Sequence, residues 1–181
     1  MAFDCINIGL KAKCENPEEI IKILDESKID YRGLDIQKDT YFKVDRRDED
    51  IRKIKKGKLE NYFMCYNKEF LENLTKKEIH FIDVKKDPPG QLERIARKTH
   101  ETIANIEKTK HIYWVNNIRF SIDKVRDIPG NYISIEAIRR KEDFDIIPQV
   151  KQVEHYKDLL NIRDKDLIFD SYVDMLFNQN K

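Results

Sequence analysis

The stretch Cys5-Ile6-Asn7-Ile8-Gly9-Leu10-Lys11-Ala12-Lys13 (CINIGLKAK, residues 5–13) opens the chain with a strict alternation of residue types. Apolar residues occupy every second position from Ile6 to Ala12, which is typical of a β-strand with one buried face. The other face then carries Asn7, Gly9 and Lys11. The first strand therefore turns an amide, a glycine and a lysine away from its apolar side.

Composition limits the classes of protein to which the chain can belong. Its 181 residues suffice for one domain with a full core, and we expect a single domain over residues 1–181. Charged residues make up 38% of the chain, but the formal net charge is only +1, so neither nucleic acid nor a membrane is expected as a partner. No apolar run approaches the roughly 20 residues that span a bilayer, and we predict a cytoplasmic protein.

The chain contains three cysteines, Cys5, Cys14 and Cys65, which are widely separated. None lies at a metal-ligand spacing from a histidine. We therefore expect reduced thiols rather than a disulfide framework or a zinc site.

Strand patterns recur along most of the sequence. Strands are predicted at 5–13, 40–44, 52–56, 61–68, 79–84, 108–115, 118–125 and 132–138. Helices are predicted at about 17–28, 91–105, 148–160 and 170–177. The first helix follows an Asn16 N-cap and has Pro17 at its first position. This pattern indicates an α+β protein with a mostly antiparallel sheet.

The second face of the strands carries many more cations than acids, because side chains alternate between the two faces of a strand. Its predicted members are Asn7, Gly9, Lys11, Lys53, Lys55, Met64, Tyr66, Lys68, Lys108, Lys110, Arg119, Ser121, Asp123, Tyr132, Ser134 and Glu136. On an open sheet this face would simply be solvated. In a closed barrel the same cations point inward and require an anion, since unpaired buried charges are costly. The alternation by itself leaves both arrangements open.

Several stretches, in order and over most of the chain, resemble the CYTH superfamily, the triphosphate tunnel fold of class IV adenylate cyclases and thiamine triphosphatases. Residues 7–13 (NIGLKAK) occupy the place of the family's ExExK, and residues 39–42 (DTYF) match its DTYF. Further matching segments are 52–57 (RKIKKG) with 60–61 (EN), 122–126 (IDKVR), 132–137 (YISIEA), 160–168 (LNIRDKDLI) and 171–176 (SYVDML). The resemblance implies a closed eight-stranded antiparallel β-barrel, or tunnel, with peripheral α-helices.

The resemblance also implies a site in which basic residues hold a triphosphate and glutamates hold a divalent metal. The basic positions are retained as Lys11, Lys53, Lys55, Lys68, Lys77, Lys110 and Arg119. Lysine and arginine donate charge-assisted hydrogen bonds to phosphate oxygens. The implied partner is therefore a phosphorylated small molecule, with a nucleotide as the first choice. Class IV relatives are often dimeric, so a homodimer is implied as well.

The metal-binding half of the motif is reduced. Four acidic positions of the family hold other residues, namely Asn7, Gly9, Arg126 and Ser134. Only Asp123 and Glu136 remain, so metal binding is predicted to be absent or weak, because hard dications prefer carboxylate ligands. Asn7→Glu combined with Gly9→Glu is expected to increase metal binding.

Three functions are compatible with these residues. The favoured one is binding of a phosphorylated ligand in a basic tunnel without a required cofactor, together with metal-independent lyase or phosphoester chemistry. In that chemistry Glu136 or Asp123 is the base, and Tyr66 or Tyr132 is a hydrogen-bonding group. The second is a class IV adenylate cyclase or organic triphosphate hydrolase that uses magnesium or manganese, and the third is a pseudoenzyme that senses or sequesters the ligand. Catalytic activity is left open, since Asp123 could instead pair with Lys110 or Arg119 across adjacent strands.

Overall fold

The computed structural model describes residues 2–43, 50–56, 59–83, 101–140 and 145–179. Its strands are β1 (Ala2–Lys13), β2 (Asp30–Phe42), β3 (Asp50–Lys56), β4 (Leu59–Leu71), β5 (Leu74–Asp83), β6 (Thr102–Val115), β7 (Ile118–Val125) and β8 (Asn131–Arg140). Its helices are α1 (Pro17–Glu26), α3 (Ile147–Leu159), the short 3-10 helix η2 (Asp164–Asp166) and α4 (Tyr172–Asn178). The predicted α+β class is confirmed.

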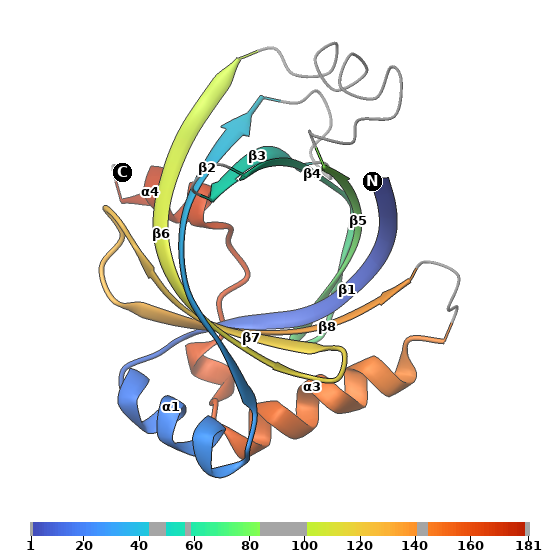
Figure 1. Cartoon of the computed structure of the whole chain (residues 1–181), viewed down its shortest axis with the longest axis vertical. Helices are drawn as coiled ribbons and strands as arrows, with labels where there is room; N and C mark the ends of the chain where they lie inside the picture. The colour runs from blue at the N-terminus through green and yellow to red at the C-terminus, as the bar shows by residue number, and fades with distance from the viewer. Residues whose placement is uncertain (1, 44–49, 57–58, 84–100, 141–144, 180–181) are drawn as a thin grey trace.

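The eight strands are hydrogen-bonded in the order β1-β5-β4-β3-β2-β6-β7-β8. Because β1 pairs antiparallel with β5 on one side and with β8 on the other, this order closes into a barrel. Figure 1 looks into the resulting ring. The register places Asn7 of β1 opposite Lys77 of β5, and Gly9 opposite Glu136 of β8. Every strand therefore has one face inside the barrel and one outside.

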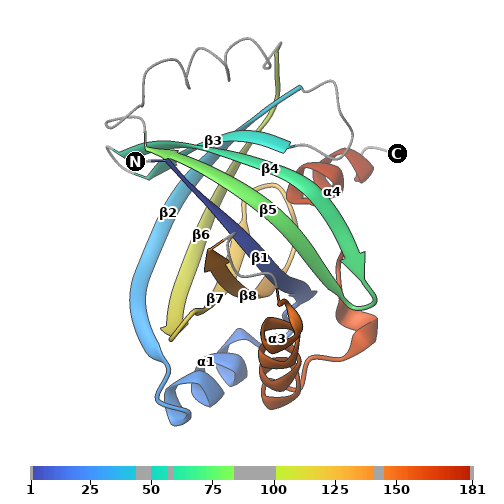
Figure 2. The same ribbon diagram turned by 90° about the vertical axis from the view of Figure 1, so that its right-hand side faces the viewer.

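The main hydrophobic core lies outside the barrel, between its wall and the helices. Ile8 of β1, Phe120 of β7 and Ile135 of β8 are completely buried there. Leu24 of α1 and Val153 of α3 pack in the same cluster. Figures 1 and 2 show α1 and α3 below the part of the ring formed by β1, β7 and β8. Burial of the apolar face of β1 under the helices leaves its polar face inside the barrel.

The caps of α1 and α4 set where these helices begin. The backbone N–H of Glu19 donates to the Asn16 side chain at 3.3 Å, as the sequence predicts. At the start of α4, the backbone N–H of Asp174 donates to Ser171 Oγ, and the backbone N–H of Ser171 donates to the Asp174 carboxylate, both at 3.1 Å. Such reciprocal bonds satisfy N–H groups that lack partners within the helix. The α4 cap also fixes the position of Tyr172, the first residue of that helix.

Strands β2 and β6 are longer than predicted. The sequence analysis expected the first of them only at 40–44 and placed a helix at 91–105, but residues 102–105 belong to β6. Residues 91–100 lie outside the described part of the chain. The two long strands pair from one end to the other, and this pairing decides the conformation of 102–105. Much of β2 is exposed on its outer face and polar on its inner face, so apolar alternation does not reveal it.

The cysteines Cys5, Cys14 and Cys65 are free thiols. Burial raises the pKa of the Cys14 thiol to about 11, which keeps it protonated and unreactive at neutral pH. Among the residues that the structure describes, no helix is long and apolar enough to cross a membrane.

Candidate functional site

A cavity of about 160 Å³ inside the barrel collects the inward-facing polar side chains. The cations that line it are Lys11, Lys68, Lys77, Lys108, Lys110 and Arg119. The acids that line it are Asp123, Glu136 and Asp170. Charges in a poorly solvated interior must be paired or must hold an ion. The cations that have no carboxylate partner are therefore the ones available to bind a ligand.

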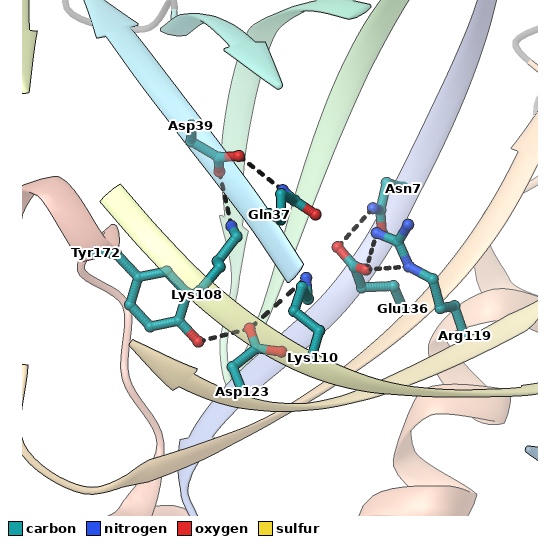
Figure 3. Close-up of polar contacts among 9 residues, drawn as sticks. All are labelled: Asn7, Gln37, Asp39, Lys108, Lys110, Arg119, Asp123, Glu136 and Tyr172. Atoms are coloured by element: carbon teal, nitrogen blue, oxygen red, sulfur yellow. Dashed lines mark hydrogen bonds and ion pairs between the residues drawn. The ribbon is translucent and has the colours of Figure 1, made fainter. Parts of the chain in front are cut away.

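Three carboxylates neutralise three of the cations between neighbouring strands, as Figure 3 shows. The pairs are Lys108 with Asp39, Lys110 with Asp123, and Arg119 with Glu136. They belong to β2, β6, β7 and β8, which are consecutive in the barrel. These four strands thus form a side of the cavity on which the three cations already have counter-charges.

The pair between Lys108 and Asp39 is the most deeply buried of the three. The Lys108 Nζ and Asp39 Oδ2 atoms lie 2.7 Å apart, and the two side chains are 3% and 0% exposed. The side-chain amide of Gln37 donates to the other oxygen of Asp39 at 2.7 Å. Both oxygens of this carboxylate are therefore occupied, and Asp39 serves to hold Lys108 in place.

Glu136 is held by donors on both of its oxygens. Arg119 donates from Nε to Oε2 at 2.9 Å and also from Nη2, while the Asn7 side chain donates to Oε1 at 2.9 Å. Burial opposes ionisation of Glu136, but the charges of Arg119 and Lys110 and these hydrogen bonds hold its pKa well below the usual range. A carboxylate that is so strongly acidic and fully hydrogen-bonded is a poor general base.

Asp123 differs from Glu136 because one of its oxygens is not used. Tyr172 Oη donates to Asp123 Oδ2 at 2.8 Å, and Lys110 Nζ lies 3.6 Å from the same oxygen. Asp123 is 1% exposed, and its Oδ1 has no hydrogen-bond partner within the described ranges. Burial and the neighbouring Asp123 charge raise the pKa of Tyr172 well above its ordinary value. Tyr172 is therefore a fixed donor, and Asp123 Oδ1 is free to accept a hydrogen bond from a ligand.

Three cations on the opposite side lack this neutralisation. Lys11, Lys68 and Lys77 have no carboxylate partner within the described part of the chain. Lys11 Nζ donates to the backbone carbonyl of Asp170 and lies 4.3 Å from the centroid of the Tyr172 ring. The three lysines come from β1, β4 and β5, which are neighbours in the barrel. We call this group, Lys11, Lys68 and Lys77, the lysine wall.

The pKa values of two lysines show which kind of ion the cavity favours. Burial, together with repulsion from Lys77 and Lys108, lowers the pKa of Lys11 to about 7. Burial also lowers the pKa of Lys110 to about 8, although Asp123 attracts its proton. Positive charge is thus unfavourable in the cavity without a ligand. An anion relieves this repulsion, whereas a divalent cation increases it.

Gly9 has a steric role at the junction of β1 and β8. A Cβ atom at this position would lie far inside the contact distance of the Ile135 carbonyl oxygen and 3.1 Å from Glu136 Cγ. Any larger residue requires a shift of the β8 backbone. Gly9→Glu therefore needs such a shift, and the increase in metal binding expected of it stays a prediction.

The remaining acids do not fit a divalent metal. Asp123 and Glu136 each already pair with a cation, and Asn7 uses its amide as a donor to Glu136. No group of three or more His, Cys, Asp or Glu side chains in the described ranges could hold a metal ion. Magnesium and manganese need several oxygen ligands, which the described side chains of this site do not supply.

The structure brings together in the cavity most of the residues that the resemblance assigns to phosphate. These residues are Lys11, Lys68, Lys77, Lys110 and Arg119. Lys53 of β3 is half-buried but does not line the cavity. The side chains of Lys55 and Tyr66 lie outside the described residues, so the role predicted for Tyr66 stays a prediction. Both proposed bases, Asp123 and Glu136, lie in the cavity.

Three important residues of the site carry no role in the sequence prediction. Lys108 lies two residues before Lys110 and therefore on the same face of its strand, and Asp39 begins the DTYF stretch. The sequence thus contained an indication for both residues. Tyr172 lies in the matched stretch 171–176, but that stretch does not reveal that its side chain enters the barrel from a separate segment. That segment is fixed to β1 by the bond from the Ile168 N–H to the Lys11 carbonyl at 2.8 Å.

Neither a scan against protein-family models nor a search of curated proteins found a match. Among solved structures, the PH1012 protein from Pyrococcus horikoshii is 19% identical with a TM-score of 0.72, covering 94% of this chain and 99% of that one. A candidate adenylate cyclase from Vibrio parahaemolyticus is 11% identical with a TM-score of 0.74, covering 95% and 98%.

A third similar structure is a candidate adenylyl cyclase from Hippeastrum, described as revealing a dominant triphosphatase activity. It is 12% identical with a TM-score of 0.61, covering 96% of each chain. At these identities the likeness shows the fold, and it extends over nearly the whole chain in each case. The chain thus shares its fold with these solved structures.

Replacement of Lys108 tests the buried ion pair. Lys108→Met is expected to lower the free energy of unfolding by about 3–5 kcal/mol, because it leaves the Asp39 carboxylate buried without its counter-charge. Lys108→Met combined with Asp39→Asn should recover part of this loss. Urea denaturation followed by circular dichroism measures both.

The matched control is Lys22→Met, which breaks an exposed 3.8 Å pair with Glu26. It should change the free energy of unfolding by under about 1 kcal/mol. A loss in Lys108→Met that is no larger than in this control would show that the buried pair does not stabilise the barrel.

Proposed function

We propose that this chain is a divergent member of the CYTH superfamily and that its barrel is a tunnel that binds a phosphorylated small molecule. The observation that carries the proposal is the lysine wall. Its three side-chain amino groups, whose charged form a bound anion favours, line the cavity without carboxylate partners in the described part of the chain. Phosphate oxygens accept strong, charge-assisted bonds from such groups. A phosphate chain along the wall would supply the counter-charge that the described part of the protein does not provide.

The arrangement of charge favours a ligand with more than one phosphate. Lys11, Lys68 and Lys77 are spread over three adjacent strands, and Arg119 and Lys110 lie in the same cavity, so donors are available to more than one phosphate. Solved structures with this fold include candidate cyclases and a protein with triphosphatase activity, whose names refer to reactions at phosphates. A nucleotide is thus the first choice of ligand. A homodimer and a cytoplasmic location stay predictions from the sequence.

Binding is proposed to be independent of metal. In a metal-dependent site, carboxylates face the dication, but here Glu136 and Asp123 face Arg119 and Lys110. A dication would have to compete with these ion pairs and would add to the repulsion that already lowers the pKa of Lys11. The cavity therefore favours an anionic ligand without magnesium or manganese.

Asp123 supports a second candidate function, which is metal-independent catalysis on the bound ligand. Its unpartnered Oδ1 is the kind of acceptor that a general base requires, whereas both oxygens of Glu136 are occupied. Asp123 would accept a proton from a ligand hydroxyl or from water, while Lys110 and Tyr172 hold its other oxygen. If the site only binds, Asp123 merely offers an acceptor for a ligand donor.

The two candidates give different results for Asp123→Asn. This change removes a negative charge from the cavity, so tripolyphosphate should bind equally well or more tightly. If Asp123 is the base, turnover of ATP or of an organic triphosphate, followed by phosphate release and by chromatography of the products, should fall by about 100-fold or more. If the wild type binds these ligands but does not turn them over, the catalytic function is excluded and the binding function stands.

A direct test of the proposed function is calorimetric titration with tripolyphosphate and with ATP. Both should bind in the presence of EDTA, with an affinity that falls as salt is added. Lys77→Met should weaken binding about tenfold, since a hydrogen bond to a charged group contributes roughly 1.5 kcal/mol or more. Lys76→Met is the matched control, because the adjacent Lys76 does not line the cavity and pairs with Glu69 at 3.3 Å. Absence of binding at low salt would refute the proposal.

Proton uptake on binding follows from the lowered pKa of Lys11. At pH 7.5 a group with a pKa of about 7 is mostly neutral, and a bound anion favours its charged form. Binding of tripolyphosphate at pH 7.5 should therefore take up more protons in the wild type than in Lys11→Arg, which is always charged. At pH 5.5 Lys11 is already protonated, and the difference should vanish. Calorimetry in two amine or sulfonate buffers with different ionisation enthalpies measures the uptake, and equal uptake at pH 7.5 would contradict the lowered pKa.

A further inference from the structure

Two large aromatic side chains remain exposed where the β4–β5 hairpin meets the segment that precedes α4. Phe70 is 59% exposed and Phe169 is 42% exposed. Their ring centroids lie 5.9 Å apart at an interplanar angle of 75°, which is an edge-to-face contact. Figure 2 shows the end of β4 beside the segment that leads to α4.

This aromatic pair continues the lysine wall outward. Phe169 itself lines the cavity, and the next residue, Asp170, accepts a hydrogen bond from Lys11. Phe70 follows Lys68 by two residues on β4, and Lys68 Nζ lies 5.1 Å from the centroid of the Phe70 ring. Two of the three wall lysines are thus adjacent to the pair. A ligand whose phosphates reach the wall would carry its remaining part past these rings.

Resting on the proposed function, we propose that Phe169, supported edge-on by Phe70, stacks on a planar ring of the phosphorylated ligand. The ligand class is then a nucleotide or a similar phosphorylated molecule with an aromatic ring. Inorganic polyphosphates and phosphorylated sugars would not use this subsite.

The geometry of the pair suits stacking. An edge-to-face contact covers one face of one ring only, so each ring keeps at least one face that its partner does not cover. Single exposed apolar side chains are common on protein surfaces, but a pair that adjoins a charged cavity matches a ligand with an apolar and an anionic part. Stacking of a base on an aromatic side chain contributes roughly 5- to 150-fold in affinity per base.

The alternative is that the two rings only fasten the C-terminal segment to the hairpin. In that case their loss would loosen the segment that carries Asp170 and Tyr172. Both residues contact Lys11, so every phosphate ligand would be affected alike. A comparison of two ligands with and without a ring therefore separates the alternatives.

The experiment is calorimetric titration of the wild type and of Phe169→Leu with ATP and with tripolyphosphate. Phe169→Leu should weaken ATP binding by roughly 5-fold or more while changing tripolyphosphate binding by less than about 2-fold. Phe169→Trp should retain the ATP affinity, and Phe70→Leu should show a smaller loss than Phe169→Leu. Phe177→Leu is the matched control, because Phe177 of α4 is 45% exposed and does not line the cavity.

The outcomes distinguish this inference from the function on which it rests. Equal weakening of both ligands in Phe169→Leu, or no weakening of ATP, overturns the ring subsite but leaves phosphate binding intact. If neither ligand binds to the wild type at low salt, the proposed function fails and the subsite with it. Melting temperatures report whether each variant is folded, and Phe169→Trp keeps the test valid if Phe169→Leu is unstable.

Discussion

The pairing of β1 with both β5 and β8 is the constraint on which the rest of the structure depends. It closes the sheet, and it divides the side chains of every strand between a barrel interior and an outer face. The apolar outer face of β1 is buried under α1 and α3, so the hydrophobic core forms outside the ring. Gly9 permits this closure, because a side chain at that position would collide with the β8 backbone.

Closure of the barrel encloses the charged side chains of the inner face. Among the described residues, the cations on one side of the barrel have carboxylate partners and those on the other side do not. Around β2, β6, β7 and β8, each of three cations has a carboxylate on a neighbouring strand. Around β1, β4 and β5, the lysine wall has none within the described residues. Burial, together with repulsion from Lys77 and Lys108, lowers the pKa of Lys11. An anion placed on this side would relieve the repulsion among these lysines.

Asn7 of β1 takes part in fixing one of the two acids of the cavity, because its side-chain amide donates to Glu136. Glu136 consequently keeps a full set of donors and a lowered pKa. Asp123 retains a free oxygen, held in place from its other side by Tyr172. Asp123 and Glu136 are therefore not equivalent, although the sequence predicts the same role for both.

The sequence by itself determined the alternation of β1, β7 and β8 and the start of α1, because each depends on local periodicity or on a cap. Through motif resemblance it also indicated the fold and most of the cavity lysines. It placed β2 poorly and a helix over 102–105, because neither face of β2 is continuously apolar and its pairing with β6 is not local. Only the tertiary structure decided which cations are neutralised and that Tyr172 and Phe169 reach the cavity, since these contacts join segments far apart in the chain. Charge pairing depends on which strands become neighbours, and that is fixed by closure rather than by the order of residues along any one strand.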